Sequence, residues 1–473
     1  MYLNFILILV GWIICFSASW AIGYFGLSCF EQIIFHLQVP LEGTNTEFIF
    51  DWLRICFSKA SFLTLLFWLP RYFMPSYAST FRTIAWSIFI LCLFYGAKTV
   101  GLFGWIANLF RKTDLYEQEY VDGKDIEITF PKQKRNLIYL YVESLETTYT
   151  SKENGGNYHD DLIPEITKLA KENVNFSHTK QLGGAHVVAG TGWTTGGIVA
   201  QSAGVPLLTP LNQKRFSDDV PFLPGAYALG DILAKEGYNQ EYLIGSNAYF
   251  GGRKFFFDQH GKFKIFDLNE AYAQHILDQD YHVFWGFEDE KLFSFAKYEL
   301  LRLAKEDKPF HLSMLTVDTH HPKGYKDDLV EDVYEERLSN IIRGNSKKIG
   351  AFIDWLKQQD FYENTTIILC GDHTSMAAEY IDKTYDKNYD RTTMNVILNS
   401  QATTKHTKER LFTSFDMFPT TLAAMGVQIE GDKLGLGTNL FSDKSTIAEK
   451  IGLKKFDQEL RTQSAYYKRK ILK

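Results

Sequence analysis

Three apolar runs of the sequence end in side chains that can bind a metal ion. Asp372 and His373 follow one run directly, Glu143 follows a second, and His320 comes shortly after a third. Each residue alone has an ordinary interpretation as a helix cap, a turn former or a solvated loop residue. Carboxylate and imidazole ligands suit Mn²⁺ or Zn²⁺, and a carboxylate-rich site without thiolate favours the harder ion. Together these residues predict one divalent cation site, without fixing the metal.

A glycine-rich stretch, residues 183–207, carries a second kind of chemistry. Within it, Thr194 and Thr195 precede a run that can be helical. A hydroxyl at a helix start meets free backbone N–H groups and the positive end of the helix dipole, which also bind phosphate. A cation beside that hydroxyl would make its oxygen a nucleophile. The alternative is an N-cap threonine in a glycine-rich turn, and this stretch alone favours the alternative.

The segments that must position these residues predict an α/β domain. Strands are expected at 136–144, at 240–245, from Phe310 onward and at 365–373, with helices at 163–174 and 343–359. Near-continuous apolar strands that alternate with helices indicate a mostly parallel sheet covered on both faces. Ligands bind beyond the carboxyl ends of strands in such sheets. The carboxylates and imidazoles are therefore expected along one edge of the sheet.

The first part of the chain is predicted to cross a membrane. Residues 1–30 carry no charged side chain and exceed the roughly 20 residues that a span requires. A cleaved signal peptide fits poorly, because the basic n-region is missing. Further spans are expected around Leu53–Phe73 and Ile84–Trp105, with buried helices of a soluble domain as the alternative. Residues 1–112 are thus assigned to about three transmembrane helices.

Composition bounds the rest of the chain. The polar segment 113–134 is interpreted as a linker, 135–445 as one large domain and 446–473 as a basic tail. The tail is expected to form a solvated helix face, with lipid contact as the alternative. A net charge of −6 without a long basic run gives no indication of a nucleic-acid partner. Cys370 is the single cysteine after residue 112, so no disulfide can form within the large domain.

Taken together, the stretches resemble the alkaline phosphatase/sulfatase superfamily, in particular its membrane-bound lipoteichoic acid synthases and phosphoglycerol transferases. The matching pieces are "NLIYLYVESLETTY", "FSHTKQL", "GTGWTTGGIVAQSAGVPL", "LTVDTHHP" and "GDHTSM", and "VPLEGT" after the first span also resembles this family. They cover residues 136–441 in the family's order, and the strongest resemblance is to the phosphoglycerol transferase I type, which modifies periplasmic glucans. The resemblance implies transmembrane helices followed by a sulfatase-like catalytic domain with a mostly parallel central sheet.

The resemblance also implies a role for each residue of the cation site. Glu143, Thr194, Asp372 and His373 match the ligands of one divalent ion, typically Mn²⁺. Thr194 matches the nucleophile.

Three further residues are implied in substrate binding. His320, in "THHP", matches the position that binds the phosphoglycerol group, and Arg253 is the candidate for a basic phosphate contact. Some relatives carry a tryptophan two residues before that arginine, where this chain has Gly251. Trp193, directly before the nucleophile, is a candidate replacement, and a core residue is the alternative interpretation.

The reaction that the resemblance implies begins with phosphatidylglycerol as the donor lipid. Thr194 would attack the phosphodiester, release diacylglycerol and carry sn-glycerol 1-phosphate as a covalent intermediate. A hydroxyl of a glycan or of a glycerol-phosphate polymer would then accept the group. The donor lies in the outer leaflet, so the catalytic domain is expected on the extracytoplasmic side of a bacterial inner membrane. Loop charges alone do not fix this orientation.

Other functions remain as alternatives. A phosphoethanolamine transferase of the same superfamily is the nearest, although such proteins usually carry several disulfides. A sulfatase would need a C/S-x-P-x-R context, which the sequence from Thr194 to Ile198 lacks. A catalytically inactive membrane binding protein would be expected to have lost a metal ligand. Transport has little support, because the spans contain no acidic residue.

Overall fold

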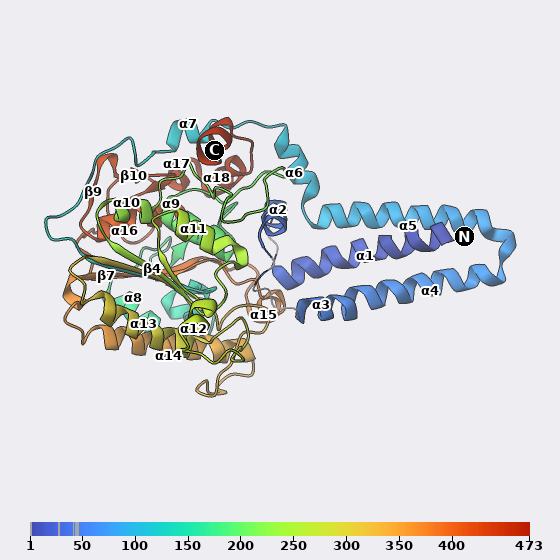
Figure 1. Ribbon diagram of the computed structural model, residues 1–473. Helices are drawn as coiled ribbons and strands as arrows, with labels where there is room; N and C mark the ends of the chain where they lie inside the picture. Colours follow the sequence, from blue (N-terminus) through green and yellow to red (C-terminus); the bar gives the residue numbers. More distant parts are fainter. Residues whose placement is uncertain (1, 27–28, 41, 43–46) are drawn as a thin grey trace.

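The computed structural model describes residues 2–26, 29–40, 42 and 47–473. A bundle of three long helices projects from an α/β domain (Figure 1). α1 (Tyr2–Phe25) runs toward the domain, α4 (Ser58–Phe73) runs away from it, and α5 (Ala78–Thr99) returns. Of the "VPLEGT" stretch, positions 41, 43 and 44 lie outside the described residues.

The bundle confirms the prediction of three apolar helices. Among the described residues, the helices that are long and apolar enough to cross a membrane are Tyr2–Phe25, Phe48–Phe73 and Pro75–Thr99. α1 packs against both α4 and α5, so the three helices form one bundle.

Two of the spans differ in their bounds from the expectation. The second begins earlier, because a π-helical turn at Leu53–Phe57 joins α3 (Glu47–Trp52) to α4 without a break. The third begins and ends before the expected Ile84–Trp105. Pro75 opens a helical turn ahead of α5, and Gly101, with a φ of 76°, ends the helix in the left-handed conformation that glycine favours.

The α/β domain is built on a seven-stranded sheet in the order β3-β8-β7-β2-β6-β4-β5. The strands are β2 (Asn136–Val142), β3 (Gly184–Ala185), β4 (Asn239–Ile244), β5 (Lys264–Phe266), β6 (Phe310–Leu315), β7 (Thr365–Gly371) and β8 (Thr393–Leu398). β5, β4, β6, β2 and β7 are parallel, whereas β8 and β3 each pair antiparallel with their neighbour. The mostly parallel sheet that the sequence predicts is therefore confirmed.

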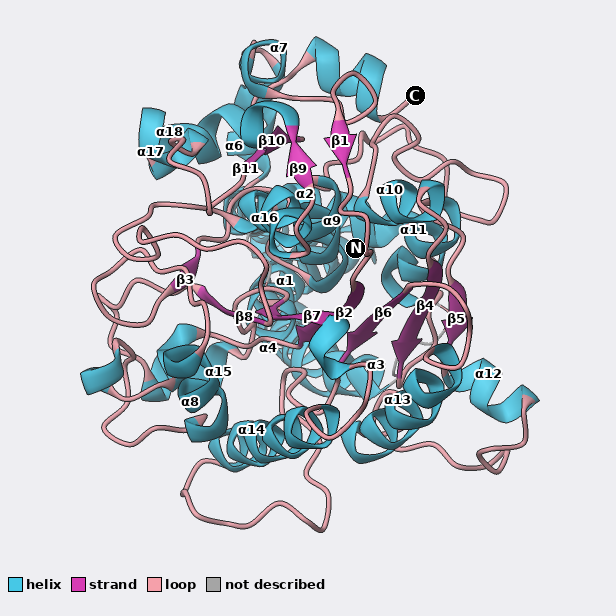
Figure 2. Ribbon diagram, turned by 90° about the vertical axis from the view of Figure 1, so that its left-hand side faces the viewer, coloured by secondary structure: helices cyan, strands magenta, loops and turns pink. Residues whose placement is uncertain are grey.

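Helices cover both faces of this sheet (Figure 2). On one face lie α8 (Pro164–Glu172), α13 (Asp289–Leu303) and α14 (Arg337–Leu356); on the other lie α9 (Thr194–Ala203), α10 (Leu229–Lys235), α11 (Arg253–Gln259) and α16 (Met417–Ala424). Alternate residues of β2 enter two different hydrophobic cores, one on each face, because successive side chains of a strand point to opposite sides. Both faces are thus buried, which explains the uninterrupted apolar character of the strands.

Shorter elements pack around the domain. The helices are α6 (Leu102–Leu109), α7 (Leu115–Glu119), α12 (Leu268–Ala273), α15 (Ala378–Thr384), α17 (Ile447–Ile451) and α18 (Leu453–Leu460), and the paired short strands are β1 (Ile128–Thr129) with β9 (Gln428–Ile429) and β10 (Lys433–Leu434) with β11 (Gly437–Thr438). The basic tail has a solvated side at Lys454 and Lys455. Its other side buries Phe456, Leu460 and Tyr467 in the core, so the tail is packed onto the domain.

A short helix that the sequence did not indicate, α2 (Phe30–Gln38), joins the bundle to the domain. Phe35 is fully buried in the domain core, and the backbone carbonyl of Gln38 accepts a 2.8 Å hydrogen bond from Phe216 N. Gly26, at the end of α1, lies against Met376, which follows β7; a Cβ added at Gly26 would lie 2.3 Å from the Met376 Cβ. The bundle therefore meets the domain at the carboxyl edge of the sheet.

Candidate active site

The four residues predicted to share one cation lie together at the carboxyl edge of the central strands. Glu143 follows β2, Asp372 and His373 follow β7, and Thr194 is the first residue of α9. The Thr194 Oγ1 atom lies 3.4 Å from Glu143 Oε2 and 3.3 Å from His373 Nε2. His373 Nε2 lies 3.5 Å from Glu143 Oε1 and 3.4 Å from Asp372 Oδ2. Side chains distant in the sequence are thus within coordinating reach of one another.

The arrangement fits a divalent cation. Four ligands with bonds of about 2.1 Å in tetrahedral geometry lie about 3.4 Å apart, close to the separations within this cluster. Asp372 Oδ2 is buried without a hydrogen-bond partner among the described residues. The His373 Nδ1 atom lies 2.8 Å from the carbonyl oxygen of Thr374, so Nδ1 carries the hydrogen and the lone pair of Nε2 is directed into the cluster.

The electrostatics of the cluster also favour a bound cation. Burial, together with the neighbouring Glu143 carboxylate, raises the pKa of Asp372 to about 7. Burial alone would raise the pKa of Glu143, but His373 and His320 outweigh it and hold that pKa below its ordinary value. Burial opposes protonation of His373, yet the two carboxylates raise its pKa. Two buried carboxylates therefore compete for one imidazole, and a divalent cation would relieve this excess of negative charge.

The backbone beyond β2 holds this cluster in place. Ser144 adopts a φ of 56°, and its N–H donates a 2.8 Å hydrogen bond to Asp372 Oδ1, as does the N–H of His373. The Thr319 hydroxyl donates a 2.6 Å hydrogen bond to the carbonyl oxygen of Glu143. Sequence reasoning missed Ser144 and Thr319, although each stands directly beside a predicted site residue.

Glycine allows α9 to approach the end of β7 closely. A Cβ added at Gly197 would lie only 1.9 Å from the backbone oxygen of Asp372, so no other residue fits there without movement. Gln201, one turn further along α9, donates a 2.9 Å hydrogen bond to the carbonyl of Gly371 and accepts one from the Tyr139 hydroxyl. The glycine-rich stretch thus places the Thr194 hydroxyl beside the carboxylates.

Arg253 provides a buried cation beyond β4, which is separated from β2 by β6. It is the first residue of α11, which follows β4, and 6% of its surface is exposed. Its Nη2 atom donates 3.1 Å hydrogen bonds to Ser246 Oγ and to the carbonyl oxygen of Asn247. Its Nε atom is buried and has no hydrogen-bond partner among the described residues. The guanidinium is therefore held in place with donor capacity left for an anion.

His320 lies in an aromatic environment that the sequence did not reveal. Its ring stacks at 4.5 Å on His321 and packs at 4.9 Å against Trp285, which in turn packs at 5.0 Å against Phe250. The guanidinium of Arg253 lies 5.3 Å from the Phe250 ring. Trp285 and Phe250 thus provide aromatic surface between the two residues that the sequence predicts to bind the phosphoglycerol group. No sequence signal pointed to Trp285, because it lies in an irregular loop remote from both residues.

Trp193 lies in the core beside α2. It is 3% exposed, and its ring lies 5.8 Å from Phe35 and 6.3 Å from His36. The residue before Thr194 therefore contacts the helix that joins the membrane bundle to the domain. These contacts agree with the core interpretation of Trp193.

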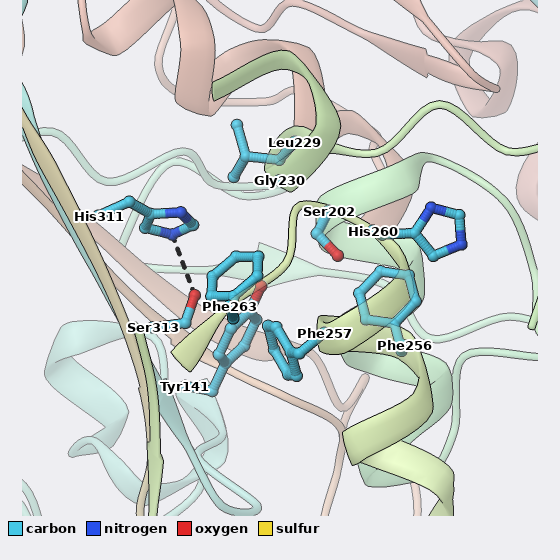
Figure 3. A pocket seen from close by; sticks show the side chains of 10 residues that line it. All are labelled: Tyr141, Ser202, Leu229, Gly230, Phe256, Phe257, His260, Phe263, His311 and Ser313. Carbon is cyan, nitrogen blue, oxygen red and sulfur yellow. Dashed lines mark hydrogen bonds between the residues drawn. The ribbon is translucent and has the colours of Figure 1, made fainter. Parts of the chain in front are cut away.

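A small internal cavity lies on the α9 side of the sheet (Figure 3). Its lining residues are Tyr141, Ser202, Leu229, Gly230, Phe256, Phe257, His260, Phe263, His311 and Ser313. The Ser313 hydroxyl and His311 Nε2 are 3.0 Å apart on its wall. The predicted site residues do not line this cavity, which belongs to the hydrophobic core.

Comparison with known proteins places the chain in a family. Residues 135–427 match the family model described as Sulfatase. Phosphoglycerol transferase I from Escherichia fergusonii is 30% identical over 351 residues, which are 70% of this chain and 43% of that protein. The chain thus spans less than half the length of the curated relatives that it matches.

Two solved structures share the fold. The lipoteichoic acid synthase LtaP from Listeria monocytogenes aligns with a TM-score of 0.51 and 16% identity, over 69% of this chain and 81% of that one. The lipooligosaccharide phosphoethanolamine transferase EptA from Neisseria meningitidis aligns with a TM-score of 0.51 and 15% identity, over 90% of this chain and 84% of that one. At these identities both show the fold alone. The family model covers more than half of the sequence, and the chain therefore belongs to the sulfatase family of the alkaline phosphatase superfamily.

Proposed function

We propose that this chain is a metal-dependent membrane phosphoglycerol transferase, which moves sn-glycerol 1-phosphate from phosphatidylglycerol to a hydroxyl of a glycan or glycerol-phosphate polymer. The observation that carries the proposal is the Thr194 hydroxyl at a helix N-terminus, 3.3 Å from His373 and 3.4 Å from Glu143. The similarity to phosphoglycerol transferase I supports the choice of the transferred group.

A lipid donor is supported by the position of the site relative to the bundle. Met376, shortly after His373, lies against Gly26 at the end of α1. Phe35 of α2 packs against Trp193, directly before the nucleophile. A lipid in the adjacent leaflet would present its headgroup at this edge of the domain. We place this edge on the extracytoplasmic side of the bacterial inner membrane, where the outer-leaflet donor and an envelope glycan would both be accessible.

In the first half-reaction, the Thr194 oxygen attacks the phosphorus of the donor and releases its proton to water. The bond between phosphorus and the diacylglycerol oxygen breaks, and that oxygen takes a proton from water. Burial lowers the pKa of His320, so its imidazole is neutral during this step. Arg253 binds a non-bridging phosphoryl oxygen through its free guanidinium hydrogens. When bound, the divalent cation, which we propose to be Mn²⁺, favours the alkoxide form of the threonine and stabilises charge on the phosphoryl group.

In the second half-reaction, the acceptor hydroxyl attacks the phosphoglycerol–threonine ester, and its proton passes to the neutral His320, which afterwards releases it to water. The Thr194 oxygen leaves and regains a proton from water. The His320 Nδ1 atom lies 2.7 Å from the carbonyl oxygen of His321, and this hydrogen bond leaves Nε2 to carry the exchanged proton. Division into two displacements lowers the barrier of each.

The test is mass spectrometry of the purified full-length protein after incubation with phosphatidylglycerol and Mn²⁺. His320→Ala is expected to discharge the intermediate slowly and to accumulate a phosphoglycerol adduct on Thr194. Thr194→Ala is expected to release no diacylglycerol, whereas Thr194→Ser, which keeps a hydroxyl, retains some release. An adduct on another residue, or undiminished release by Thr194→Ala, would contradict the mechanism.

The same assay distinguishes the donors. Labelled phosphatidylglycerol and labelled phosphatidylethanolamine are offered to the wild type in parallel, with and without Mn²⁺. Metal-dependent release from phosphatidylglycerol supports the proposal. Release from phosphatidylethanolamine alone would show a phosphoethanolamine transferase. A protein that retains the metal but turns over neither lipid would be a binding protein.

A further inference from the structure

A second group of metal-ligating side chains lies at the β3–β8 edge of the sheet. Among the described residues, His178, His186 and Asp390 each offer one ligand atom, and these three atoms lie within 4.8 Å of one another. His178 lies in the loop before β3, His186 follows β3 directly, and Asp390 lies shortly before β8. None of the three belongs to the cation site beside Thr194.

The antiparallel pairing of β3 with β8 brings these residues together. Gly184 pairs with Met394 and Ala185 with Thr393, so the chain just after β3 lies beside the chain just before β8. The backbone N–H of His186 donates a 3.0 Å hydrogen bond to the carbonyl of Phe412, which fixes that position further. The group is therefore held by the sheet itself.

The environment of His186 points to a ligand. The residue is 3% exposed, and its Nε2 atom is buried without a hydrogen-bond partner among the described residues. Its Nδ1 atom lies 3.6 Å from Asp390 Oδ1, too far for a hydrogen bond. The nitrogen that faces Asp390 is Nδ1, and it is the atom through which His186 would bind an ion together with that carboxylate.

The distances within the group suit an ion between the side chains. Two ligands of one zinc ion lie about 3.4 Å apart in tetrahedral geometry, close to the separation of His186 and Asp390. The rings of His178 and His186 lie 4.9 Å apart at an angle of 68°, so they approach edge to face. Gly184 N lies 3.5 Å from His178 Nδ1, at the outer limit of a hydrogen bond.

We propose that His178, His186 and Asp390 form a second metal site, which binds Zn²⁺ with water in its fourth position. Two imidazoles and one carboxylate are a common zinc donor set, richer in nitrogen than the three oxygens and one imidazole beside Thr194. The two sites therefore differ in their preferred ion. Asp390 is largely exposed, so the ion can enter from solvent.

The second site would act on the loop that carries the nucleophile. His186 begins the segment that leads to Thr194, and within it the Val188 N–H donates a 2.9 Å hydrogen bond to the Thr191 hydroxyl. An ion at His186 would fix the start of this segment to β8. The role is one of positioning, and the site does not depend on the proposed transferase reaction.

The experiment measures bound zinc in the purified full-length protein after zinc loading and dialysis against metal-free buffer. In a His373→Ala background, which disables the first site, one zinc per chain is expected to remain. Adding His178→Ala and Asp390→Asn, both at positions that are at least partly exposed, is expected to remove it. His159→Ala is the matched control, because His159 forms an exposed pair with Asp160 at 2.8 Å and is expected to leave zinc binding unchanged.

A second readout reports on the ligands themselves. Cobalt substituted for zinc in the His373→Ala protein is expected to give a visible absorption spectrum with nitrogen and oxygen ligands, absent after His178→Ala with Asp390→Asn. Circular dichroism checks that the variants are folded. Loss of all zinc on dialysis of the His373→Ala protein, or zinc retained by a folded variant lacking His178 and Asp390, would overturn the proposal.

Discussion

Lys348 is expected to be the main electrostatic support of the loop that carries His320. Its Nζ atom lies 2.8 Å from Asp318 Oδ2 and also contacts the Asp327 carboxylate. Only 8% of the lysine side chain and 1% of the Asp318 side chain are exposed. Asp289, also buried, accepts hydrogen bonds from the backbone N–H of Asp318 at 3.1 Å. Lys348→Met would therefore leave buried carboxylates without a cation.

The expected cost follows from that burial. Removing one partner of a buried ion pair costs about 3–5 kcal/mol, which lowers the Tm by roughly 5–10 °C in a domain of this size. Burial raises the pKa of Asp318 to about 6 even with the lysine present. A raised carboxyl pKa gives stability that is present at low pH and lost as pH rises. Without Lys348 the pKa of Asp318 rises further. The difference in unfolding free energy between the wild type and Lys348→Met is therefore expected to shrink by about 1.4 kcal/mol per pH unit as the solution is acidified.

The assay is thermal unfolding of the full-length protein in detergent, followed by tryptophan fluorescence at about pH 8 and about pH 5. Lys347→Met is the matched control on the same helix, since its pair with Glu331 is 3.5 Å long and solvent-exposed. Such a surface pair contributes less than about 1 kcal/mol. Equal losses in both variants, or a loss in Lys348→Met that does not change with pH, would refute this account of the loop.

Three further outcomes can be checked. Burial lowers the pKa of His311 to about 3, so the wild type is expected to lose about 1.4 kcal/mol of stability per pH unit below about pH 6.5. His311→Gln should lose stability less steeply over the same range. Identical stability–pH profiles of the two proteins in unfolding experiments would count against this role of His311. Gly197→Ala is expected to abolish diacylglycerol release, because the added methyl group would lie 1.9 Å from the backbone oxygen of Asp372. Gly104→Ala is the control and should retain release, because its methyl group would meet no described atom within 4 Å. Arg253→Gln is expected to raise the KM for phosphatidylglycerol and to lower kcat, so that kcat/KM falls about tenfold or more through loss of a charge-assisted contact. Unchanged kinetics would exclude a phosphate-binding role for Arg253.

The sequence by itself determined the architecture and which side chains gather in the predicted cation site. Span length is set by the thickness of a bilayer, so apolar runs predicted three crossing helices. Strands buried on both faces are apolar throughout, which made β2, β6 and β7 visible in the sequence. Because parallel strands end at one edge, the sequence was enough to predict that Glu143, Asp372 and His373 lie together.

Only the tertiary structure decided which irregular segments meet. Trp285 beside His320, Phe35 against Trp193, and the group formed by His178, His186 and Asp390 depend on the path of loops and on strand register. Such contacts leave no periodic signal, since neither a helical nor a strand repeat links the residues. The sequence also did not predict the early end of α5 or the buried face of the tail. Local composition shows how apolar a segment is, whereas the residues packed around it decide where it ends and which side chains it buries.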